Sequence, residues 1–179
     1  MNNENLFNQG MEYFNEGKNS KALEIFSNLA NSGHVEAQNH LAFMYEEGKG
    51  VDVDYLMAEK YYLKSAEGGN SAAQFNLSLM YLNGLGVEKD IKKAHKWLEA
   101  AAKQGVPQAQ LNLAILIIKT ENRLNMGMGS LRYAYTWACT ALEQGFEPAK
   151  SIVEMMRHME AGHDHTEWRK IVGVPEVKN

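Results

Sequence analysis

Apolar residues recur along this chain at steps of three and four, which is the spacing of one face of an α-helix. In the best-formed stretch, residues 73–105, Leu77, Met80 and Tyr81 lie on one such face, and Trp97 lies on another. Glycines and polar residues separate these amphipathic segments, so the pattern predicts short helices joined by turns. Helices are expected at about 3–16, 20–31, 35–47, 54–67, 71–83, 90–103, from Pro107 onward, at 130–144 and at 148–160.

The helical pattern repeats at a fixed spacing. Ala37, Ala73 and Ala109 are 36 residues apart, as are Gly48 and Gly84. A helix pair cannot bury its own apolar face, so a period of this length indicates stacked pairs, an α/α solenoid. The other columns are Tyr45 and Tyr81; Asp54 and Asp90; Ala22, Ala58 and Ala94; and Gly33, Gly69 and Gly105, after which the spacing grows to 40 at Ala134, Gly145 and Ala149.

Residues between the helices have definite roles in this interpretation. Gly84 and Gly86 suit a loop that needs positive φ angles, which only glycine adopts without strain. Asp90 stands where an N-cap belongs, with Asp54 and Ser130 in the same column. The sequence therefore predicts helix–loop–helix units with capped ends.

These residues together resemble the Sel-one-like repeat (SLR) family, a relative of the tetratricopeptide repeat. The resemblance implies an all-α fold, a right-handed α/α solenoid superhelix of about four tetratricopeptide/Sel-one-like repeats and nine or ten helices, with a C-terminal capping segment. Family members are generally adaptors that hold proteins or peptides together, and many are bacterial. The motif matches at Ala73, Leu77, Tyr81, Gly84, Gly86, Val87, Asp90, Lys93, Ala94, Trp97, Ala102 and Gly105, with Ser78 in place of a family glycine.

The predicted organisation is one repeat array over residues 1–162 and a capping tail over 163–179. The first unit has only a short turn between Gly17 and Ala22 and is closer to a tetratricopeptide, while the third has a longer loop at 119–129. A short helix near 167–172 is expected to cover the open end of the stack. The units run at about 3–34, 35–70, 71–106 and 107–146, with a half unit at 147–160.

Composition and charge exclude several functional classes. The 179 residues carry a formal net charge of −4 with acidic and basic residues interleaved, which disfavours a nucleic-acid interface. The only cysteine is Cys139, so no intrachain disulfide is expected. The start of the chain lacks the features of a secretory signal and no run is long enough for a membrane span, so a cytoplasmic protein is expected, monomeric or weakly self-associating.

The strongest candidate site is the concave face, which the first helices line in tetratricopeptide-like arrays. Apolar side chains there would form a floor, and the column His40, Asn76 and Asn112 would hold the backbone of an extended segment, since amides both donate and accept hydrogen bonds. The alternatives are that these residues pack between helices or that the tail fills the groove. The predicted protein- or peptide-binding residues are Asn39, His40, Phe43, Phe75, Asn76, Leu79, Asn83, Leu111, Asn112, Ile115 and Lys119.

A second hypothesis is a metal-binding module or metal-dependent enzyme that uses His158, His163 and His165, because imidazoles are ligands for zinc and nickel. The alternative interpretation is a solvated polar turn, and no cofactor is predicted. No nucleophile motif is present, and Gly127–Ser130 has the glycines of a phosphate loop without its lysine. The sequence therefore predicts a binding protein without catalytic activity.

Overall fold

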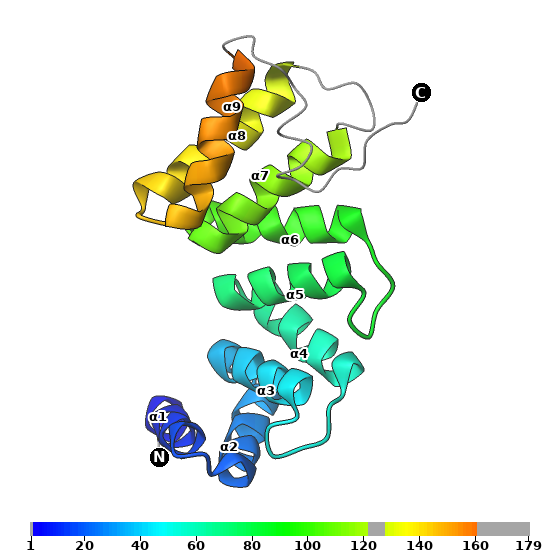
Figure 1. The fold of residues 1–179 in the computed structure, drawn as a ribbon. Helices are drawn as coiled ribbons and strands as arrows, with labels where there is room; N and C mark the ends of the chain where they lie inside the picture. The colour runs from blue at the N-terminus through cyan, green and yellow to red at the C-terminus, as the bar shows by residue number, and fades with distance from the viewer. Residues whose placement is uncertain (1, 122–127, 161–179) are drawn as a thin grey trace. The chain divides into compact units, whose positions relative to one another are not determined.

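The computed structural model describes residues 2–121 and 128–160 (Figure 1). All the regular structure in these residues is helical, which confirms the all-α prediction, with nine α-helices and one 3₁₀ helix. The helices are α1 (Asn3–Asn15), α2 (Asn19–Asn31), α3 (Val35–Glu47), α4 (Tyr55–Glu67), α5 (Ser71–Asn83), α6 (Ile91–Lys103), α7 (Pro107–Glu121), α8 (Met128–Glu143), η1 (Glu147–Ala149) and α9 (Lys150–Glu160).

The chain divides into two compact units, Met1–Ala100 and Ala101–Asn179. In the first unit, each helix from α1 to α5 packs against its neighbours in sequence (Figure 1). In the second unit, α7 packs against α8, and α8 packs against α9. Packing between sequential helices is the arrangement that stacked helix pairs require to bury their apolar faces.

Aspartates cap the second helix of the two best-formed repeats, as the sequence predicts. Oδ1 of Asp54 accepts a hydrogen bond of 3.0 Å from the backbone N–H of Met57, and Oδ1 of Asp90 accepts one of 2.9 Å from that of Lys93. The same role predicted for Ser130 is wrong, because α8 begins at Met128 and places this serine inside the first turn.

The loop glycines are required by geometry at two points. Gly84 ends α5 with a left-handed φ of 74°, and Gly86 has a φ of 66°. A Cβ at Gly86 would collide with the side chain of Tyr55, so this loop lies directly against the start of α4. Gly50 makes the equivalent approach to the backbone of Asn19 at the start of α2. The glycine loop is therefore a packing element between consecutive repeats of the first unit.

Small residues at fixed spacing allow the helices to come close. The two alanine columns predicted from the sequence are completely buried, and aromatic and aliphatic side chains fill the space around them. These alanines are Ala22, Ala58, Ala94 and Ala134 in the second helices, and Ala37, Ala73, Ala109 and Ala149 at the starts of the first helices.

A buried glutamine column, which the sequence analysis did not single out, joins each repeat to the helix before it. The side-chain amides of Gln38 and Gln74 donate to the backbone oxygens of Ala30 and Ala66 at 3.1 Å. In the second unit Gln110 donates to the oxygen of Ala102 at 3.2 Å. The 36-residue spacing of these glutamines was the available signal. Each bond satisfies a carbonyl at a helix end, where intrahelical partners are lacking.

The two ends of the array differ from the central repeats. The short turn predicted after the first helix is confirmed, with Lys18 N–H bonded to the carbonyl of Tyr13 at 2.8 Å. The last helix was predicted to begin at Pro148, which is wrong. Residues Glu147–Ala149 form a 3₁₀ turn that contains Pro148, and α9 begins at Lys150. The tail predicted at 163–179 lies outside the described residues.

Candidate protein-binding face

The predicted binding residues lie on the first helices of three repeats. Those of α3 and α5 belong to the first unit, and those of α7 belong to the second. On α5, Phe75, Asn76, Leu79 and Asn83 follow one another at steps of one to four residues and are at least partly exposed. The corresponding positions of α3 are Asn39, His40 and Phe43, which are partly exposed as well. We call these seven residues the α3–α5 stripe.

On α7 the predicted positions are not equally accessible. Asn112 and Ile115 are partly exposed and Lys119 is exposed. Leu111 is only 8% exposed, so it belongs to the core of the second unit. Because α7 is apolar along most of its length, the sequence pattern does not show which of its leucines and isoleucines point outward.

His40 packs into an aromatic cluster formed with the two preceding helices. Its ring stacks on Phe26 of α2 with centroids 5.3 Å apart, and it also contacts Phe7 and Phe14 of α1 at 5.6 and 6.2 Å. Phe43, one turn later, meets Phe14 edge-on at 6.1 Å. Burial among these rings lowers the pKa of His40 below its usual range. The ring thus acts here as a neutral packing group.

Asn76 occupies the same repeat position as His40 but belongs to a hydrogen-bond network. The hydroxyl of Tyr62, which is fully buried, donates to Oε2 of Glu46 at 2.7 Å. The nearby Asn76 side chain lowers the pKa of the same hydroxyl and so offsets part of its rise. Burial is the largest cause of that rise, followed by the charge of Glu46 and the hydrogen bond to it. The network joins α3, α4 and α5 directly beneath the stripe.

Sequence reasoning missed Tyr62 as the partner of this column. The available signal was a second spacing, since Phe26 precedes His40 by the same 14 residues that separate Tyr62 from Asn76. At each site an aromatic residue of the preceding second helix meets the column residue.

Within this face, Oδ1 of Asn39 is shielded from water, and no donor for it is found in the described part of the chain. A buried acceptor without a partner costs free energy, which a donor would recover.

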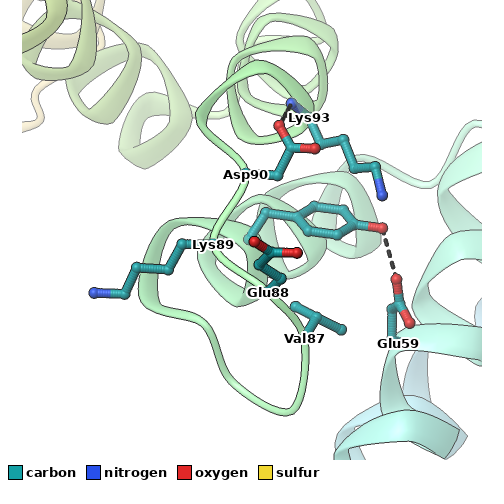
Figure 2. A pocket seen from close by; sticks show the side chains of 7 residues that line it. Glu59, Val87, Glu88, Lys89, Asp90 and Lys93 are labelled. Carbon is teal, nitrogen blue, oxygen red and sulfur yellow. Dashed lines mark hydrogen bonds between the residues drawn. The ribbon is translucent and has the colours of Figure 1, made fainter.

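A separate pocket of about 250 Å³ lies beside the glycine loop between α5 and α6 (Figure 2). The hydroxyl of Tyr81 donates to Glu59 at 2.7 Å, and Lys93 lies over the Tyr81 ring at 4.9 Å. Burial, then the hydrogen bond to Glu59, raises the pKa of Tyr81. Figure 2 shows Lys89 pointing away from the pocket. The carboxylates and ammonium groups that line the pocket carry charges of both signs. Glu59 already accepts a hydrogen bond and Lys93 already contacts an aromatic ring, so no ligand chemistry is favoured.

The hypothesis of a histidine metal site finds no support in the residues that the structure describes. No three histidine, cysteine, aspartate or glutamate side chains gather there in a way that would hold a metal ion. His158 lies exposed on α9, whereas His163 and His165 lie outside the described residues. None of the described helices is both long and apolar enough to cross a membrane.

Comparison with known proteins identifies the repeats. A family model described as Sel1 repeat matches residues 35–70 and 71–106. Each match covers a glycine loop, an aspartate cap and a glutamine of the buried column, all placed above. No curated protein matches the chain.

Two solved structures share the fold over most of this chain. A Sel1 repeat protein from Oxalobacter formigenes is 28% identical with a TM-score of 0.77 and covers 88% of this chain and 61% of its own. The structure of c5321, a protective antigen of uropathogenic Escherichia coli strains displaying an SLR fold, is 27% identical with a TM-score of 0.77. That match covers 96% of this chain but 38% of the antigen, so this chain spans less than two thirds of either protein. The chain therefore contains two Sel1 repeats and shares the α/α solenoid fold of Sel1-like repeat proteins.

Proposed function

We propose that this chain is a protein–protein interaction scaffold that binds a segment of another protein along the α3–α5 stripe. Sel1 repeat proteins are generally interaction scaffolds and are typically non-enzymatic, which supports the general assignment. The observation that carries the specific one is the composition of the stripe on α5, where Phe75 and Leu79 stay partly exposed beside Asn76 and Asn83. Apolar side chains next to amides provide both a desolvating surface and hydrogen-bonding groups.

The network below the stripe supports this assignment. The hydrogen bond of Tyr62 to Glu46 joins α4 to α3, and the Asn76 side chain of α5 lies near the same hydroxyl, which favours a preorganised surface at this point. A preorganised surface loses less conformational entropy on binding and binds more tightly for the same contacts.

The proposal is tested by removing the apolar anchors without touching the network. The double variant Phe75→Ala/Leu79→Ala is expected to lose about thirtyfold in affinity for partners captured by wild type, since each anchor of an interface contributes about 1 kcal/mol or more. A matched control, Val53→Ala/Leu56→Ala, removes apolar side chains that are 53% and 67% exposed on the α3–α4 connection and α4. The control should retain wild-type affinity.

The measurement is quantitative capture from cell extract after crosslinking, followed by titration of each captured protein, with circular dichroism melting to show that both variants fold. The proposal fails if both folded variants bind the captured proteins as wild type does. It also fails if the control loses as much as the stripe variant, because binding would then depend on apolar surface in general.

A further inference from the structure

The first helices of the first unit carry only negative side chains, whereas the second helices carry both signs, with a lysine excess on α6 alone. Helices α1, α3 and α5, which carry or flank the stripe, contain five glutamates and no lysine, arginine or aspartate. Helices α2, α4 and α6 contain seven lysines and four glutamates. The glutamates of the first group are Glu4, Glu12, Glu36, Glu46 and Glu47.

Three of these carboxylates border the stripe directly. On α3, Glu36 and Glu47 are exposed and lie one turn before His40 and one turn after Phe43, while Glu46 is partly buried beside Tyr62. Residues spaced by three or four positions share a helix face, so Glu36 and Glu47 stand at the two ends of the α3 part of the stripe. On α5 no charged residue is present at all. The face is therefore apolar and amide-bearing in its middle, with acidic groups along α3.

The acidic groups are not neutralised within the described part of the chain. No lysine or arginine there lies within ion-pair distance of Glu36 or Glu47. Glu36 lies 3.3 Å from Nδ1 of His34, but this nitrogen accepts the N–H of Ala37 and so carries no proton to donate. Two exposed carboxylates of one sign beside an apolar surface leave a negative potential for a binding partner to match.

The lysines of the second helices are occupied differently. Lys60 and Lys64 lie over the ring of Tyr61 at 5.5 and 5.6 Å, and Lys96 lies over that of Trp97 at 4.6 Å. These cation–π contacts hold the ammonium groups against aromatic side chains of their own helices. The first helices of the first unit themselves contain no lysine or arginine and remain acidic.

From this separation of charge we infer that the segment bound by the α3–α5 stripe is basic and amphipathic, with lysine or arginine side chains flanking apolar ones. The inference rests on the proposed function and specifies its partner. Apolar side chains of the segment would meet Phe43, Phe75 and Leu79, and its cations would meet Glu36 and Glu47. Complementary charge of this kind increases the association rate and selects among partners with similar apolar surfaces.

The test uses the full chain and three fluorescent peptides of equal length. One consists of leucine and lysine, one of leucine and glutamate, and one of leucine and serine. Anisotropy titration is expected to show binding of the leucine–lysine peptide, at least tenfold tighter than that of the other two. The preference should disappear near 1 M salt, where the Debye length falls to about 3 Å.

Matched variants locate the effect on the face. Glu36→Gln/Glu47→Gln removes two charges beside the stripe, and Glu24→Gln/Glu67→Gln removes two exposed charges from α2 and α4. The first variant should weaken binding of the leucine–lysine peptide about fivefold, and the second should leave it within about twofold of wild type. Equal weakening by both variants would overturn the inference, because the preference would then reflect net charge alone. Equal binding of the leucine–glutamate peptide, or no binding of the leucine–lysine peptide, would overturn it as well.

Two further outcomes separate this inference from its alternatives. If the leucine–serine peptide binds as tightly as the leucine–lysine one and Phe75→Ala/Leu79→Ala abolishes both, the proposed function stands and the basic partner is rejected. The exposed lysines of the second helices also make a second copy of this chain a possible occupant. Light scattering that shows self-association at low salt, lost in Glu36→Gln/Glu47→Gln, would assign the face to that copy and overturn the inference.

Discussion

His40 and Asn76 occupy the same position in consecutive repeats of the first unit, yet their surroundings differ in kind. His40 stacks on Phe26 in a cluster of aromatic rings, whereas Asn76 bonds the hydroxyl of Tyr62. The partner comes from the preceding second helix in both cases, at the same sequence separation. The repeat therefore fixes which positions meet, and the identities of both residues at each site decide whether the contact is aromatic stacking or polar.

The difference between the two sites affects how the stripe responds to change. The His40 site is held by ring contacts, which tolerate small displacements. Among the described residues, no carboxylate lies within ion-pair distance of the His40 imidazole. The Asn76 site is held by directional bonds to a part-buried carboxylate, so it is more rigid and more easily broken by losing one member. Three predictions test this contrast.

The largest effect is expected from Tyr62→Phe, which removes the central oxygen of the network. Glu46 and Asn76 would both lose a partner in a partly buried site, so the free energy of unfolding should fall by about 2 kcal/mol. Urea denaturation followed by circular dichroism measures this loss. Tyr81→Phe is the matched comparison: its bond to Glu59 has the same 2.7 Å length but borders a pocket that water can enter. A loss as large in Tyr81→Phe would contradict the special role of the Tyr62 network.

A smaller effect on the free energy of unfolding is expected from placing the amide of the Asn76 site at the His40 site. His40→Asn places an amide against Phe26, which offers no hydrogen bond, and should cost about 1 kcal/mol. Adding Phe26→Tyr should recover most of this loss, because the new hydroxyl can bond the new amide. A double-mutant cycle in urea measures the coupling. If Phe26→Tyr has the same effect beside His40 and beside asparagine, the repeat position does not determine the pairing.

The smallest effect is a dependence on pH that belongs to the His40 site. Because burial lowers the pKa of His40 in the folded state, the unfolded chain binds the proton more readily. Stability contributed by this site is present above the unfolded pKa of about 6.5 and is lost as the pH falls toward the folded pKa. Unfolding of wild type and His40→Asn is compared at about pH 7 and about pH 5. Wild type should lose more stability on acidification, and equal losses in both proteins would refute the assignment.

Much of the fold could be predicted because its determinants are local and repeated. The helix bounds of the first six helices follow the apolar period, with Asp54 and Asp90 marking starts and Gly48 and Gly84 marking stops, and the structure agrees within one residue. The third repeat was harder, because its long loop breaks the spacing and so misplaces the start of α8. Local chemistry specifies an element well only where the column that defines it is intact.

The candidate face was only partly predictable. The residues of α5 emerge partly exposed as the sequence suggests, but the sequence could not show that Leu111 is buried or that His40 and Asn76 have partners beneath them. The exposure of a side chain and its hydrogen-bond or ring partners depend on the side chains of the neighbouring helix. A helical period identifies the apolar face of a helix, but it does not show which residues pack against that face. The peptide-clamp role assigned to the asparagine column stays a prediction.

The sequence alone determined the repeat and most of the helices, because alanines, loop glycines and capping aspartates at fixed spacing leave few other ways to bury the apolar faces. Only the tertiary structure decided the surroundings of each column residue. Packing α2 on α3 brings Phe26 against His40, and packing α4 between α3 and α5 brings Tyr62 between Glu46 and Asn76. A contact between residues on different helices depends on their positions in three dimensions. For the same reason, the α3–α5 stripe and its acidic border became defined as a surface only when the helices were placed side by side.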